Sequence, residues 1–233
     1  MSREPETQGS PRKRIAEMTA LALATCGVAP ERLAMVEPDP GVLQVRRLAA
    51  WLMRRRAGLG SADIAAALGV DPAFVNQTLF LARIGIAARG LRINGPIAEV
   101  AASLARVFAA REGEPGHVDA ASLAEVREAV LKAFGLSLAS FTGEGRGARE
   151  ARARQSFAWL AEQLTPAAPK EIGRWMNRER TTVSAGLARV DRIGGVADLR
   201  RQILARLAEG RPDRAMLDDF ATALERLGAP QPR

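Results

Sequence analysis

Residues 177–183, NRERTTV, place several hydrogen-bonding side chains directly before an apolar run. Arginine can donate two parallel hydrogen bonds to guanine, and threonine can bond a base edge or contact the methyl group of thymine. A threonine at this place could instead cap an ordinary helix, with the neighbouring charges left in solvent. The segment is therefore a candidate surface for reading DNA or, alternatively, the start of a capped amphipathic helix.

The charge balance favours a polyanionic partner. The 233 residues include 34 Lys and Arg against 26 Asp and Glu, a net charge of +8, and the sequence pI is near 11.1. A pI above about 9 is typical of nucleic-acid-binding domains. An arginine bias of the genome is the alternative explanation, and only the positions of the arginines can decide between the two.

Several function classes are disfavoured by residues that the chain lacks. One cysteine, Cys26, and one histidine, His117, are too few for a cysteine-based metal site, and we find no Asp/Glu, Ser/His or Cys/His arrangement that would support catalysis. No GxxxxGK[ST] phosphate loop occurs, so we expect no nucleotide cofactor. No apolar window reaches the roughly 18 residues of a membrane span. We expect a protein that is not an enzyme, uses no cofactor, binds no membrane and is cytoplasmic and nucleoid-associated.

Apolar residues recur at helical spacing along nearly the whole chain, and no alternating pattern typical of strands interrupts them. The sequence therefore predicts an all-α fold. Gly and Pro breaks, together with helix stops such as Gly27 and Gly58, divide it. The predicted parts are a disordered basic tail (1–13), a degenerate helix-turn-helix domain (14–92), a linker helix (93–116), a helix-turn-helix DNA-binding domain (117–196) and a C-terminal helical pair (197–233).

The two halves align without a gap at an offset of 108 residues. At that offset Gly27 meets Gly135, and the triplet at 50–52, Ala-Trp-Leu, meets the same triplet at 158–160. Few positions are identical, so shared helicity could explain any single match. Together the matches indicate a degenerate tandem duplication.

The second half contains the stronger helix-turn-helix pattern. A short helix over 169–176, a tight turn and a second helix from Arg180 are the parts that such a motif needs. Lys170 and Arg178 would lie where phosphates pass, and Arg180, Thr181 and Thr182 would lie at the tip of the reading helix.

Three motifs of this half, ARARQ (151–155), EIG (171–173) and NRERTTV (177–183), resemble the DNA-binding C-terminal domain, domain IV, of the bacterial replication initiator DnaA. The resemblance runs over residues 122–195. It implies a fold of two tandem domain IV-like helix-turn-helix bundles joined by a linker helix, followed by the C-terminal helical pair. The family pattern Gly-Arg-Asp-His-Thr/Ser-Thr-Val is changed at three places, where Asn177 replaces Gly, Glu179 replaces Asp and Arg180 replaces His.

The resemblance assigns roles to individual residues. It implies that Glu179, Arg180 and Thr181 read bases in the major groove. It also implies contacts to the DNA backbone or the minor groove by a basic and hydroxyl set: Lys170, Arg178, Thr182, Arg146, Arg149, Arg152 and Arg154. Ala148 stands where the family places its minor-groove arginine, so Arg146 and Arg149 are the substitutes. These departures favour a target site related to, but distinct from, the initiator's own.

The first half is a weaker candidate for reading DNA. Its equivalent of NRERTTV is GVDPAFV, with Pro72 in the place of Arg180. Asn76 and Gln77 could still read adenine. Phosphate contacts could come from Arg46, Arg47 and Arg54, with Arg55 and Arg56. The alternative is a copy that no longer binds DNA and instead packs or binds protein.

These features predict a sequence-specific transcription regulator of double-stranded DNA, an activator, whose residues 197–233 contact RNA polymerase or a co-regulator. Activators of phage-like or gene-transfer-agent genes are the narrower analogue. Two alternatives stay open. One is a replication regulator that competes for initiator sites, and the other is an adaptor that uses helix-turn-helix folds for protein contact.

Overall fold

The computed structural model describes residues 10–34, 39–88, 90–91, 96–109, 120–145, 147–210 and 212–229. Within these ranges all regular structure is helical, which confirms the all-α prediction. The chain divides into two compact units, Met1–Pro115 and Gly116–Arg233.

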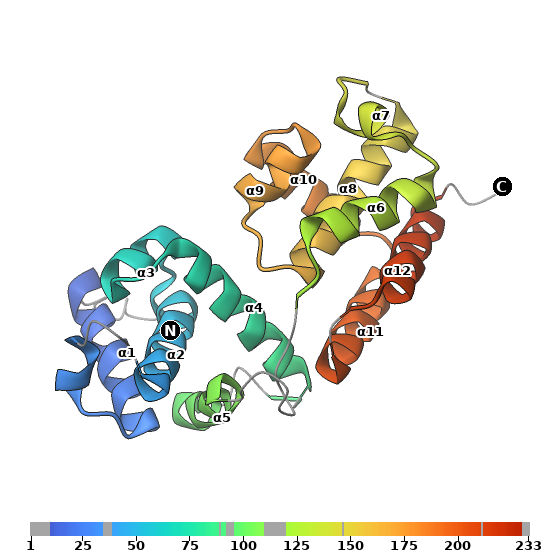
Figure 1. The fold of residues 1–233 in the computed structure, drawn as a ribbon. Helices are drawn as coiled ribbons and strands as arrows, with labels where there is room; N and C mark the ends of the chain where they lie inside the picture. Colours follow the sequence, from blue (N-terminus) through green and yellow to red (C-terminus); the bar gives the residue numbers. More distant parts are fainter. Residues whose placement is uncertain are drawn as a thin grey trace, which may run out of the picture. The chain divides into compact units, whose positions relative to one another are not determined.

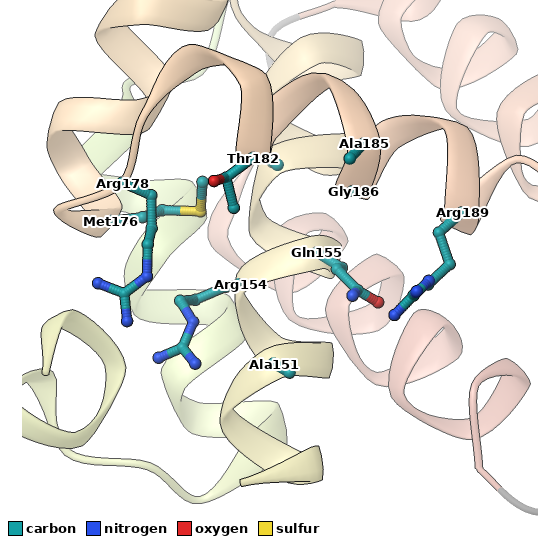
Figure 2. A pocket seen from close by; sticks show the side chains of 10 residues that line it. Ala151, Arg154, Gln155, Met176, Arg178, Thr182, Ala185, Gly186 and Arg189 are labelled. Carbon is teal, nitrogen blue, oxygen red and sulfur yellow. The ribbon is translucent and has the colours of Figure 1, made fainter. Parts of the chain in front are cut away.

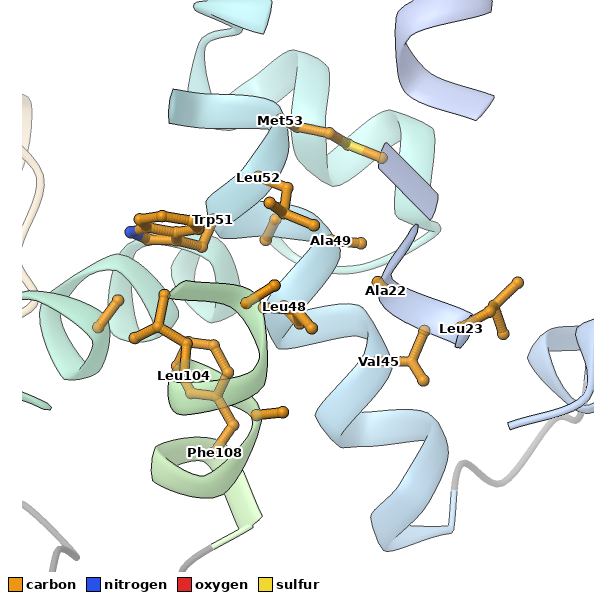
Figure 3. Packing of buried hydrophobic residues seen from close by; sticks show 14 of the residues in the cluster. Ala22, Leu23, Val45, Leu48, Ala49, Trp51, Leu52, Met53, Leu104 and Phe108 are labelled. Carbon is orange, nitrogen blue, oxygen red and sulfur yellow. The ribbon is translucent and has the colours of Figure 1, made fainter. Parts of the chain in front are cut away.

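The first unit is built around α2 (Pro40–Ala57), whose central residues are buried. Its other elements are α1 (Pro11–Cys26), a short 3-10 helix (Pro30–Ala34), α3 (Ser61–Leu68), α4 (Pro72–Ala88) and α5 (Ile97–Ala109) (Figure 1). Leu48, Trp51 and Leu52 of α2 cluster with Leu104 and Phe108 of α5 (Figure 3). A core dominated by aliphatic residues follows from the 4% aromatic content.

The predicted boundary of the N-terminal tail needs correction. Helix α1 begins at Pro11, inside the segment 1–13 that the sequence analysis took as disordered. The Ser10 side chain accepts a hydrogen bond from the Lys13 amide at 3.4 Å, and proline is compatible with the first helical turn because its missing N–H has no partner there. Residues 1–9 lie outside the described ranges.

The predicted linker helix is also corrected, because α5 belongs to the core of the first unit. It packs against α1, α2 and α4. A Cβ atom at Gly85 of α4 would lie 2.5 Å from Val107, so glycine permits the close approach of these two helices. A linker would leave the apolar face of α5 in water, and the buried Leu104 and Phe108 show that this face is covered. Of the predicted segment 93–116, residues 93–95 and 110–116 lie outside the described ranges.

The second unit is built around α8 (Ala148–Leu164), which is buried along most of its length. Its other helices are α6 (Leu123–Phe134), α7 (Leu138–Thr142), α9 (Pro169–Met176), α10 (Arg180–Val190), α11 (Val196–Glu209) and α12 (Arg214–Leu227) (Figure 1). A capping box between Ser122 and Glu125 begins α6. Phe141 packs edge-on against Phe157, with ring centroids 5.5 Å apart, and so fixes α7 to α8.

The predicted C-terminal pair is not a separate appendage. Helix α12 packs on α6 and α8, and α11 packs on α8 and α12. The ion pair between Lys132 and Asp218, at 2.5 Å, and the pair between Glu128 and Arg214, at 2.6 Å, reinforce the contact between α6 and α12. The amphipathic pattern of α12 therefore completes the core of the second unit, with Phe220 among its buried residues.

The boundaries of the helix-turn-helix coincide in the two units at the offset of 108 residues, up to the start of its second helix. Helices α3 and α9 have 8 residues each. Each is followed by a residue in the left-handed conformation, Gly69 with φ of 63° and Asn177 with φ of 54°. The next helices, α4 and α10, begin at Pro72 and Arg180. The register of the two helix-turn-helix motifs is thus the same.

Within the described residues, no single helix combines the length and apolar character needed to cross a membrane. Residues Ser61–Leu68 and Pro72–Ala87 pass that test only as a pair bent by 110°. The described residues also contain no group of three or more His, Cys, Asp or Glu side chains that could hold a metal ion.

Candidate nucleic-acid interface

The helix-turn-helix of the second unit joins α9 to α10 through a short turn that begins at Asn177. A Cβ atom at Gly173 would lie 2.5 Å from the backbone oxygen of Arg178, so a glycine at 173 lets the turn fold back onto α9. Ile172 of α9 and Val183 of α10 are fully buried. These contacts fix the direction in which α10 presents its first turn.

The first turn of α10 is exposed and receives no side-chain cap. Glu179 occupies the N-cap position without a capping hydrogen bond, and the first turn contains no acidic residue. Arg180, Thr181 and Thr182 are exposed. The capped-helix alternative required Thr181 or Thr182 to be the cap, and it is therefore wrong. The helix start keeps free backbone N–H groups and a positive end, which favour an anionic ligand.

A cleft of about 290 Å³ lies between α8 and α10 (Figure 2). Its polar lining residues are Arg154, Gln155, Arg178, Thr182 and Arg189. Among the residues that the structure describes, no acidic side chain lines it. The structure thus gathers three arginines from separate segments beside the tip of α10, which is the electrostatic arrangement that suits phosphate.

Two of these arginines already donate within the protein. Arg178 donates to the backbone oxygens of Asn177, at 2.7 Å, and Gly143, at 2.5 Å. Arg154 is buried and donates to the backbone oxygens of Phe141, at 3.1 Å, and Gly145, at 2.6 Å. Burial lowers the pKa of Arg154, and the charge of Arg178 lowers it further. The prediction that Arg154 and Arg178 contact DNA is corrected, because both guanidinium groups are engaged by backbone oxygens of the protein itself.

The prediction that Arg152 contacts DNA needs a larger correction. Its guanidinium donates to the backbone oxygen of Glu225 at 2.5 Å and lies 5.7 Å from the centre of the Phe134 ring. It therefore attaches α12 to α8 instead of facing the cleft. Arg149 is exposed beside the end of α6, where a Cβ atom at Gly135 would meet its guanidinium at 2.9 Å. Arg146 lies outside the described residues.

Lys170 and Arg180 are two predicted contacts that remain free in solvent. Both are exposed, Lys170 in the first turn of α9 and Arg180 at the start of α10. No hydrogen bond or ion pair joins either side chain to another residue in the described part of the chain. Each is therefore available to an external ligand.

The predicted DNA contacts of the first unit are mostly engaged in its own structure. Arg46 donates to the backbone oxygen of Leu33 at 3.3 Å, Arg47 to that of Phe108 at 3.3 Å, and Arg54 to that of Leu59 at 2.9 Å. Burial lowers the pKa of Arg47.

Asn76 accepts a hydrogen bond from Ser61 at 2.9 Å, whereas Gln77 is exposed. The positions equivalent to Arg180, Thr181 and Thr182 hold Pro72, Ala73 and Phe74. The first unit therefore lacks a basic reading tip.

Two features of the second unit were missed by sequence reasoning. Arg189 is exposed at the cleft, and its place seven residues after Thr182 puts both on one helix face, a spacing that could have identified it. The buried Trp159 donates to Asp191 at 2.8 Å, and Arg200 pairs with the same carboxylate. No local pattern signals that contact, because its members are far apart in the sequence.

Comparison with known proteins agrees with this geometry. Residues 123–190 match the family model described as the bacterial DnaA protein helix-turn-helix. The match covers α6 to α10 and ends before α11, so it is confined to the second unit. No curated protein and no solved structure matches the chain. The second unit is thus similar over residues 123–190 to the helix-turn-helix of the bacterial DnaA protein.

Proposed function

We propose that this chain, which carries a DnaA-type helix-turn-helix, is a sequence-specific regulator of transcription and acts as an activator. The observation that carries the proposal is the exposed tip of α10, Arg180, Thr181 and Thr182, which has no side-chain cap. It lies beside a cleft that is lined by arginines and, within the described part of the chain, by no acidic residue. A helix that only packed would not need this arrangement.

Each residue of the tip has a distinct task in this proposal. Arg180 donates two hydrogen bonds to guanine, Thr181 bonds a base edge or contacts a thymine methyl group, and Glu179 accepts from cytosine. Thr182, Lys170 and Arg189 contact phosphates. The phosphate contacts supply affinity for any sequence, and the three reading residues supply the preference.

We also propose that the first unit is a diverged copy of the second. The coincident helix boundaries and the left-handed residues Gly69 and Asn177 support a duplication. Because its tip is Pro72, Ala73 and Phe74, this copy contributes little to base reading. Its proposed role is to support the protein or to bind a protein partner.

A transcription regulator also needs a surface for RNA polymerase or a co-regulator. A groove of about 580 Å³ between α11 and α12, lined in part by Leu199, Met216 and Phe220, is the surface that we propose for this contact. The proposal includes no catalytic activity, since the sequence offers no recognisable Asp/Glu, Ser/His or Cys/His catalytic arrangement. Action on DNA implies a cytoplasmic, nucleoid-associated location.

A replication regulator is the second candidate, since the family match is to part of an initiator. It requires tight binding to the initiator's own sites. The replacements at Glu179 and Arg180 alter two of the three reading positions and favour a different site.

The test is selection of bound duplexes from a random library by the full-length protein at near-physiological salt. The matched control is the full-length double variant Arg180→Ala, Thr181→Ala. We expect one enriched motif for the natural sequence and none for the variant. Enrichment of the initiator's own sites would favour the replication regulator. No enrichment by the natural sequence would refute base reading and leave the adaptor as the explanation.

A further inference from the structure

The loop that follows α7 is held by side chains from two other parts of the second unit. We propose that Arg178 and Arg154 latch residues 143–145 of this loop, Arg178 to the turn of the helix-turn-helix and Arg154 to α8. We also propose that Arg178 is a positioning residue for base reading and not a phosphate contact. The DNA part of this proposal rests on the function proposed above. The latch itself exists without DNA.

The loop and the end of α7 present backbone oxygens that need donors. Helix α7 has 5 residues, so its last carbonyl groups have no partner within the helix. Arg154 donates to the oxygens of Phe141 and Gly145, and Arg178 donates to that of Gly143. Asn177 donates from its side-chain amide to the oxygen of Thr142 at 3.4 Å. Side chains from α8 and from the turn thus satisfy this segment.

One guanidinium spans the turn and the loop. Arg178 donates from Nη1 to the Asn177 oxygen and from Nη2 to the Gly143 oxygen, at 2.7 Å and 2.5 Å. The planar fork of arginine can hold two acceptors in fixed geometry, whereas lysine offers a single flexible charge. The link therefore depends on arginine and not only on a positive charge.

The electrostatics of the cleft agree with a structural role. Arg154 and Arg178 lie in one cleft, and Figure 2 shows both guanidinium groups directed to the same side. The repulsion between the two guanidinium groups is offset because each of them donates to two backbone carbonyl oxygens. A cation placed only for phosphate would remain in solvent, as Lys170 does.

The latch links the loop to the start of the reading tip. The loop leads directly into α8, and the turn leads directly into the tip at Arg180. Because Arg178 holds both the turn and the loop, the position of the tip relative to α8 is set in the free protein. DNA then meets a tip whose direction is fixed, so the latch restricts which sites are read.

The test compares full-length Arg178→Lys and Arg178→Ala with the natural sequence, with Lys170→Ala as the phosphate-contact reference and Arg201→Lys as the matched substitution outside the cleft. Hydrogen exchange of the free protein follows the amides of Phe141 and Gly143, which donate to the oxygens of Ser137 and Ala139. Binding to the selected duplex is measured over a series of salt concentrations.

We expect both Arg178 variants to exchange these amides about tenfold faster or more, since each loses a charge-assisted hydrogen bond. We expect weaker selective binding with an unchanged salt slope, whereas Lys170→Ala lowers the slope by about one. Arg201→Lys should match the natural sequence. If Arg178→Lys binds normally, Arg178→Ala lowers the slope by about one and exchange does not change, Arg178 is a phosphate contact and the proposal is overturned. Failure of base reading alone would leave the exchange result intact.

Discussion

Trp159 donates a hydrogen bond from its indole Nε1 to Asp191 Oδ1 at 2.8 Å, across 32 positions of sequence. Trp159 is fully buried in α8, and Asp191 directly follows α10. Arg200 of α11 pairs with the same carboxylate and lies 5.5 Å from the centre of the Trp159 ring. The end of the reading helix is thus fastened to the core and to the next helix.

Replacing Asp191 by Ala should leave the buried N–H of Trp159 without an acceptor. We expect the free energy of unfolding to fall by about 1–3 kcal/mol. Asp191→Asn keeps an acceptor oxygen and should lose less. Urea unfolding of the three proteins measures the difference, and equal losses for Ala and Asn would show that the hydrogen bond is not what fastens this helix.

Arg180→Lys should separate charge from base recognition. Lysine keeps the positive charge but not the rigid fork, so we expect binding at low salt to be retained and discrimination at one guanine position to fall by about 1–3 kcal/mol. Titration of the selected duplex and of one with that guanine replaced gives the difference. Undiminished discrimination would remove Arg180 from the reading set.

Lys170→Ala and Arg189→Ala should weaken binding to every sequence alike. Both side chains are exposed, and Arg189 lines the cleft. We expect each substitution to lower the slope of log affinity against log salt by about one and to leave the selected motif unchanged. A changed motif would mean that the residue reads bases.

Asn76→Ala with Gln77→Ala should leave the selected motif as it is in the natural protein. Asn76 is bonded to Ser61, and the neighbouring tip has no charge. Loss of the bond should lower the stability of the first unit by about 0.5–1.5 kcal/mol. A shortened motif would show that the first unit also reads DNA.

Local rules were sufficient for much of the fold. Glycine after a helical pattern ends α1, α2 and α6 as expected, and the helix-turn-helix boundaries follow from Pro72, Gly69 and the polar start of α10. The exposed position of Arg180, Thr181 and Thr182 at the start of α10 was also predicted, whereas their role in base reading stays a prediction. These features depend on residues adjacent in sequence.

Features that depend on distant partners were not predictable. The pattern of α5 shows an apolar face but not which helices cover it, so a core helix was taken for a linker. Arg152, Arg154 and Arg178 are held within the protein, because each guanidinium donates to a backbone oxygen of a segment other than its own. The residue type shows that an arginine can donate hydrogen bonds, but only the tertiary fold determines which acceptor it meets.

The packing of α12 against α6 has a consequence for the order of folding. The pair between Lys132 and Asp218 joins residues 86 positions apart. During synthesis α10 leaves the ribosome before α12 does, while the side of α6 that α12 covers is still exposed. Closing so long a loop is slow compared with forming a helix. The contact between the first and last helices of the second unit should therefore form late, after α8, α9 and α10 have formed.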